Sequence, residues 1–190
     1  MSFAVAPGSI FALVGKAGSG KAAIVRSALG QIRPEGGQVL VLGLDPRRNR
    51  RRLKERVRYD AAAGELRIEA AAAGSTLLVV AEDPGRASLA DRVGFLKEGR
   101  LLLDEEVPIL LSRFRRIRYI NELTETRTEY GNELDLFDAV RVRVRGWGVD
   151  AVVSNFDETA FERFQATDGV RDARADPMTV EEIFAAVVGI

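Results

Sequence analysis

The sequence predicts an α/β protein, in which a sheet with flanking helices precedes a small α+β unit. Three observations support this fold class. Residues 9–14 form a short apolar run that ends in a glycine-rich turn, and a helical pattern begins directly afterwards at residue 21. Residues 75–81 form a second strongly β-forming run. After about residue 113, basic and apolar residues alternate with a period of two, which is typical of half-buried antiparallel strands.

The turn after the first strand carries a phosphate-binding pattern. Gly15, Gly20 and Lys21 have the spacing G-x-x-x-x-G-K, the P-loop signature apart from its last position. The glycines let the backbone curl and expose its N–H groups, which together with the positive end of the next helix form a cradle for polyphosphate. Lys21 would reach the β- and γ-phosphates. The less favoured alternative is a glycine-rich turn without a ligand. The predicted phosphate-binding residues are Gly15, Lys16, Ala17, Gly18, Ser19, Gly20, Lys21 and Ala22.

Position 22 departs from the signature. The motif requires Ser or Thr there, because the hydroxyl ligates Mg²⁺, and this chain has Ala22. A methyl group cannot coordinate a hard cation, which takes oxygen ligands. Ser19 lies within the loop and does not occupy that position. The sequence therefore predicts a phosphate cradle that lacks its own Mg²⁺ ligand, and it identifies no metal-binding residue.

Composition narrows the chemistry that is available. The 190 residues suffice for one domain with a small appendage, and 28 basic residues balance 28 acidic ones, so no global field favours nucleic acid. The chain has no cysteine and no histidine, which excludes disulfides, thiolate chemistry and imidazole bases. No stretch approaches the ~20 apolar residues of a membrane helix. We therefore expect a cytoplasmic protein.

The first 113 residues contain further predicted elements. We expect helices at 21–29, 61–74, 87–93 and 107–113, strands at 9–14, 38–42 and 75–81, and a hairpin over 94–103 with its turn at 98–99. Residues 47–58 carry eight basic side chains against the single acid Glu55. We interpret this stretch as a solvated basic helix and not as a nucleic-acid or phosphate patch, because no aromatic residues are interleaved.

The second part of the chain shows no catalytic constellation. Its pattern predicts strands at 114–120, 140–146, 151–154 and 170–175, and helices at 157–167 and from 179 onward. Thr179 and Glu182 have the spacing of a capping box at the start of the last helix. We interpret the alternating arginines as the solvated face of a sheet in preference to a polyanion site.

With these elements in order, the chain resembles the ATP-binding subunits of ABC transporters, especially bacterial exporters with a C-terminal extension. The similar segments are residues 8–21, 33–46, 74–83 and 89–104, and the tail from 113 onward is similar to the extension. The resemblance implies a reduced P-loop NTPase-like sheet with flanking helices, followed by a small α+β C-terminal unit. It divides the chain into a truncated nucleotide-binding domain, 1–112, and an extension, 113–190.

Several family motifs have no counterpart here. The glutamine loop, the helical subdomain, the LSGGQ signature and the acidic strand are missing between residues 60 and 74, and the switch histidine would lie near Glu82. Phosphoryl transfer depends on positioned Mg²⁺, positioned water and charge stabilisation. The resemblance therefore leaves no catalytic residue to name. Although the family is one of ATPases, we expect negligible hydrolysis by the isolated chain.

The resemblance also predicts how the remaining strands pair. The strand at 9–14 would lie between 75–81 and the hairpin strand at 95–103, and the helix at 65–73 would cross over to 75–81. The lost acidic strand would lie beyond 75–81, which leaves that strand as an exposed edge. Such an edge invites association.

Two classes of function follow. The first is an ATP-binding component of a bacterial ABC exporter, which would lie at the inner face of the membrane. Its partners would be a permease subunit and a second subunit in a homo- or heterodimer, and it would bind no nucleic acid. Phe3 is a loose candidate for stacking on adenine. The second is a non-catalytic binding or regulatory module that associates with a permease or a full-length ATPase and keeps the P-loop as a relic. A small P-loop kinase is disfavoured, because it also needs the hydroxyl after Lys21 and usually an arginine-bearing lid, for which only 47–58 is available.

Overall fold

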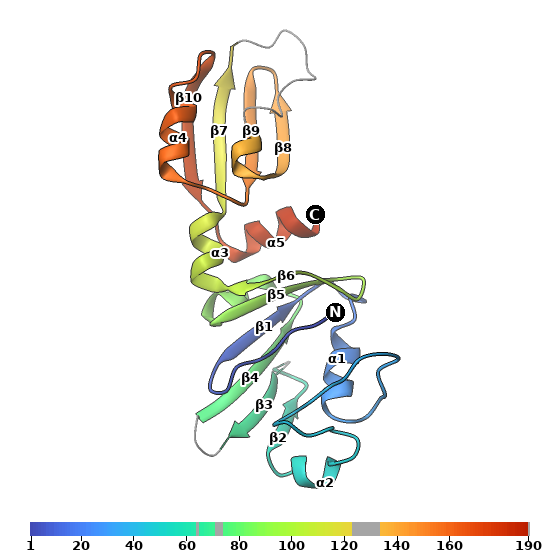
Figure 1. Cartoon of the computed structure of the whole chain (residues 1–190). Coiled ribbons are helices and arrows are strands. Elements are labelled where there is room, and N and C mark those ends of the chain that lie inside the picture. The colour runs from blue at the N-terminus through green and yellow to red at the C-terminus, as the bar shows by residue number, and fades with distance from the viewer. Residues whose placement is uncertain (64, 71–73, 123–133, 190) are drawn as a thin grey trace. The chain divides into compact units, whose positions relative to one another are not determined.

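The computed structural model describes residues 1–63, 65–70, 74–122 and 134–189. The chain divides into two compact units, Met1–Val107 and Pro108–Ile190. The assignment of residues 1–112 and 113–190 to two functional domains stays a prediction. Each unit has its own sheet (Figure 1).

The N-terminal unit is built on a mixed sheet with the strand order β2-β3-β4-β1-β5-β6. β1 runs parallel to β4 on one side and to β5 on the other, and the remaining neighbours are antiparallel. This confirms the α/β fold class and the expected neighbours of the first strand. The strands are β1 (Ile10–Val14), β2 (Val57–Asp60), β3 (Glu65–Ala70), β4 (Gly74–Ala81), β5 (Arg92–Lys97) and β6 (Arg100–Glu106).

The central strand β1 is buried because it has a strand on each side and an apolar sequence. Phe11, Leu13 and Val14 are at most 1% exposed, and Leu13 is in register with Val80 of β4 and Gly94 of β5. Burying a side chain of this size contributes about 1.5–3 kcal/mol. The burial fixes the end of β1, and therefore the starting point of the loop that follows it.

The expected helix at 61–74 is wrong. Residues 65–70 form β3, which pairs antiparallel with β4 along its whole length and joins β2 in a hairpin. The described residues 61–63 and 65–70 contain no helix, and residues 64 and 71–73 of the expected helix lie outside the described part of the chain. The edge expected to be exposed along 75–81 is covered by β3. Helix propensity is a weak preference that tertiary context overrides. Here the open edge of β4 offered a ladder of backbone hydrogen bonds, and the Glu-Leu-Arg-Ile-Glu alternation of 65–69 suits a strand.

Three other expectations are also corrected. Residues 38–42 form no strand, because the chain turns at once through left-handed Leu42 and Gly43, which leaves only a bridge between Val41 and Leu44. In the basic stretch 47–58 only α2 (Arg50–Leu53) is helical, and the last two residues of the stretch already belong to β2, which begins at Val57. The helix expected at 87–93 is a short 3₁₀ turn, η1 (Pro84–Leu89), that gives way to β5.

The C-terminal unit is the expected small α+β fold. Its antiparallel sheet has the order β10-β7-β9-β8, and Phe161 and Phe164 of α4 pack into its core with Ile117, Tyr119 and Phe137. The predicted strands and helices are confirmed, with shifts of at most three residues at their ends. The elements are α3 (Val107–Arg113), β7 (Arg115–Asn121), η2 (Asp135–Phe137), β8 (Ala139–Arg145), β9 (Gly148–Val153), α4 (Glu158–Gln165), β10 (Val170–Pro177) and α5 (Val180–Val188).

The capping box predicted at the start of α5 is present. The Thr179 hydroxyl accepts a hydrogen bond from the Glu182 N–H, and the Glu182 carboxylate accepts one from the Thr179 N–H at 3.0 Å. We expect Thr179→Ala to lower the unfolding free energy by about 1 kcal/mol, because the first turn of α5 loses a partner. Urea denaturation followed by circular dichroism measures this. Thr179→Ser keeps the cap and should be close to wild type; equal losses in both variants would contradict the prediction.

Candidate functional site: the phosphate-binding loop

The loop between β1 and α1 (Lys21–Ala28) has the backbone of an anion cradle. Gly18 and Gly20 adopt left-handed conformations, with φ of 78° and 106°. Such angles strain any residue with a Cβ. Gly20 is also the N-cap of α1 and supplies no side-chain cap. In the first helical turn the Ala23 N–H donates to the Gly20 carbonyl at 3.1 Å. The N–H groups of Lys21 and Ala22 remain for a negatively charged ligand, which the positive end of the helix also attracts.

Gly15 fits where no other residue fits. Its N–H donates to the Ala81 carbonyl at 3.2 Å, which ties the end of β1 to the end of β4. A Cβ at this position would lie 2.5 Å from the backbone oxygen of Leu96 and 2.5 Å from Ser19 Oγ. The beginning of the loop is thus pressed against β5, and only a glycine allows this approach.

Lys21 folds back into the loop. Its ammonium donates to the Gly15 carbonyl at 2.5 Å, to the Lys16 carbonyl at 2.7 Å and to Ser19 Oγ at 3.3 Å. Burial lowers the pKa of Lys21, and the negative charge of Glu82, at 3.9 Å, raises it in part. The loop therefore encloses a positive charge beside the exposed helix end. A polyphosphate needs such an arrangement.

The β5–β6 hairpin supports the loop from the side. The N–H of Gly99, in the turn between these strands, donates to the Ser19 carbonyl at 2.8 Å. The turn is sharp, with left-handed conformations at both Glu98 and Gly99. The hairpin was predicted from sequence, but its contact with the loop was not, because nothing in the chain links residues 19 and 99 by spacing.

The structure brings the eight predicted residues together around one turn of backbone. Gly15, Ser19 and Lys21 are buried, whereas Lys16, Ala17 and Gly18 lie at the surface, where a ligand can approach. Ala22 is exposed in the first turn of α1 and presents a methyl group. In the described part of the chain, no three acidic side chains gather into a group that could hold a metal ion. At position 22 the loop therefore offers no oxygen for Mg²⁺, and its role in phosphate binding stays a prediction.

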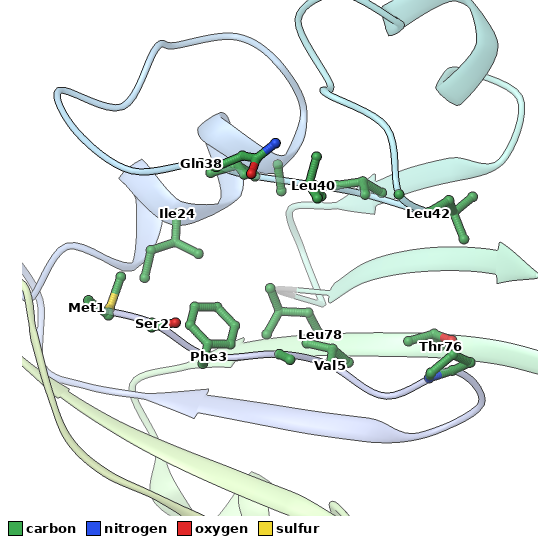
Figure 2. A pocket seen from close by; sticks show the side chains of 16 residues that line it. Met1, Ser2, Phe3, Val5, Ile24, Gln38, Leu40, Leu42, Thr76 and Leu78 are labelled. Atoms are coloured by element: carbon green, nitrogen blue, oxygen red, sulfur yellow. The ribbon is translucent and has the colours of Figure 1, made fainter.

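Phe3 lies in an apolar hollow that is not lined by Lys21 of the loop. Its ring packs against Phe11 with 5.2 Å between centroids. The hollow has a volume of about 600 Å³, and its walls are residues 1–7, residues 38–43, α1 and β4. Figure 2 shows the Phe3 ring close to Ile24, one turn along α1 from Lys21. The adenine-stacking role of Phe3 stays a prediction.

A buried parallel strand, a glycine-rich loop and a helix that starts at a loop-bound lysine are compatible with a reduced P-loop NTPase-like fold. The family model for ABC transporters matches residues 1–69, which include β1, the loop and α1. The match supports an ABC transporter ATPase-type domain in this part of the chain, and such a domain binds ATP. No curated protein matches the chain. Within the described residues, no helix is both long and apolar enough to cross a bilayer.

Proposed function

We propose that the protein is an ATP-binding component of the ABC exporter type, which holds nucleotide phosphates in the loop from Gly15 to Ala22 and is impaired in hydrolysis. One observation carries the proposal: the enclosed ammonium of Lys21 beside an uncapped helix N-terminus. This arrangement combines a fixed positive charge with free backbone donors, which is the chemistry that polyphosphate recognition requires.

The impairment follows from what surrounds the loop. Ala22 supplies no hydroxyl for Mg²⁺, and the residue after β4, where the family has its switch histidine, is Glu82. The place beyond β4, where the family has its acidic strand, is taken by β3, which runs antiparallel. Its C-terminal end is therefore directed away from the loop. Loss of a single charge-stabilising group costs roughly a hundred- to a thousandfold in rate, so hydrolysis should be negligible.

Titration of the purified chain with a fluorescent ATP analogue tests the proposal. We expect saturable binding that weakens at least tenfold in Lys21→Ala, because the buried cation is lost; a charge-assisted hydrogen bond contributes about 1.5–3 kcal/mol. Lys54→Ala is the matched control, since Lys54 is an exposed lysine outside the loop. Mg²⁺ should change the affinity little, because Ala22 offers no ligand.

Two outcomes would contradict the proposal. The first is the absence of binding at millimolar nucleotide, which would leave the loop as a scaffold and favour the regulatory-module alternative. The second is equal binding by wild type and Lys21→Ala, which would place the nucleotide elsewhere. As partners we propose a membrane permease and a second ATPase domain, because ABC ATPase domains generally act in such assemblies. Co-purification with a permease tests that part.

A further inference from the structure

Glu82 brings a negative charge to the opening of the phosphate-binding loop. It is the first residue after β4, at the end of the strand that neighbours β1. Its carboxylate lies 3.9 Å from the Lys21 ammonium, although 67% of the side chain is exposed. The neighbouring Asp83 behaves differently, because its carboxylate accepts a hydrogen bond from Gly85 N–H at 2.9 Å within its own turn. Only the first of the two adjacent acids pairs with the loop.

Lys21 has no hydrogen left for a phosphate in this arrangement. An ammonium has three donors, and Lys21 directs them to the carbonyls of Gly15 and Lys16 and to Ser19 Oγ. A phosphate oxygen must therefore take over at least one of these hydrogens. As it approaches, it also meets the negative charge of Glu82, and like charges at such distances repel.

We propose that Glu82 is an internal competitor of the phosphate ligand, whose carboxylate neutralises Lys21 in the empty loop and must be displaced when a polyphosphate binds. This inference rests on the proposed function and concerns the selectivity of the same site. A small anion such as sulfate or inorganic phosphate reaches the donors around one phosphate position only, so its contacts offset the repulsion from Glu82 less fully. A triphosphate also contacts the N–H groups along the loop and the helix end, and these contacts offset the displacement of Glu82.

The test compares Glu82→Gln with Asp83→Asn. The second variant removes the same charge one residue away, and its side-chain oxygen can still accept the hydrogen bond from Gly85 N–H. The probes are inorganic tripolyphosphate and Mg²⁺-free ATP, measured by displacement of the fluorescent analogue. Glu82→Gln should bind both roughly three- to tenfold more tightly than wild type, the range expected for one partly exposed charge. Asp83→Asn should change the affinity less than twofold, and sulfate should compete measurably only in Glu82→Gln.

A second measurement follows the ion pair in the absence of any ligand. Loss of Glu82 removes the charge that raises the pKa of Lys21. The Lys21 amine should therefore react faster with an acylating reagent in Glu82→Gln at alkaline pH, as read by peptide mass spectrometry. Lys16, on the exposed side of the loop, should react at an unchanged rate. An unchanged rate at Lys21 would overturn the inference.

The outcomes separate this inference from the proposed function. Equal affinities in wild type and Glu82→Gln, with binding still lost in Lys21→Ala, would overturn the competitor role alone. Binding that is absent in wild type and present in Glu82→Gln would support it. Absence of binding in both proteins would overturn the inference and the proposed function together. Weaker binding of Mg²⁺-ATP by Glu82→Gln, with metal-free ATP unaffected, would make Glu82 a metal ligand instead and would also overturn the inference.

Discussion

Gly15→Ala is expected to abolish nucleotide binding and to lower the unfolding free energy of the N-terminal unit by about 1–3 kcal/mol. The added methyl would lie 2.5 Å from the Leu96 carbonyl oxygen, a backbone atom of β5 that cannot move aside cheaply because β5 is paired with a strand on each side. Either β1 or the loop must shift. A shift of the loop would break the hydrogen bond from Lys21 to the Gly15 carbonyl. Chemical denaturation and the fluorescent-nucleotide titration measure the two effects.

Gly36→Ala is the matched control. Gly36 has open space around its ideal Cβ position and does not adopt a left-handed conformation. The same change there should be neutral or stabilising by about 0.4–1 kcal/mol, because alanine reduces the freedom of the unfolded chain. Similar losses of stability in both variants would contradict the steric explanation for Gly15.

Leu13→Ala is expected to cost about 2–5 kcal/mol, which is enough to unfold a marginally stable unit. Leu13 is fully buried near the C-terminal end of β1, and it belongs to the same core as Phe11, Leu78 and Leu96. The cavity left by the deletion would open below the strand that positions the P-loop. Urea denaturation should therefore show a lower midpoint, and the residual folded protein should bind nucleotide less tightly.

Leu89→Ala makes the same chemical change at the surface. Leu89 is 85% exposed at the end of η1, so its loss should change the stability by less than about 0.5 kcal/mol. If the two leucine variants had similar midpoints, β1 would not be the buried centre of the N-terminal unit. A large effect only at Leu13 would agree with the sheet order.

The backbone of the loop between β1 and α1 was predictable from sequence because its requirements are local. Left-handed backbone at Gly18 and Gly20 needs glycine, and a helix that starts with a lysine follows directly. The capping box at Thr179 was predictable for the same reason, since both partners lie within one turn. The hairpin turn at Glu98 and Gly99 is likewise a local signal.

The errors occurred where pairing at a distance decided the structure. Alanine-rich residues before β4 favour a helix locally, yet residues 65–70 form β3 because the neighbouring edge offered a ladder of partners. Residues 38–42 have the composition of a strand but find no partner strand, and they turn at Leu42. At 65–70 the hydrogen bonds to β4 outweighed the helix preference of the segment itself. At 38–42 the strand preference of the segment was not enough without hydrogen bonds to a neighbouring strand.

By itself, then, the sequence determined the strand–loop–helix at residues 10–28, the missing hydroxyl at Ala22 and the α+β character of the second unit, because each depends on residues a few positions apart. The tertiary structure alone decided that Glu82 meets Lys21, that Gly99 supports the loop, and that β3 covers β4. These contacts join segments up to eighty residues apart, and the sheet order that brings them together depends on the burial of β1 between its two neighbours.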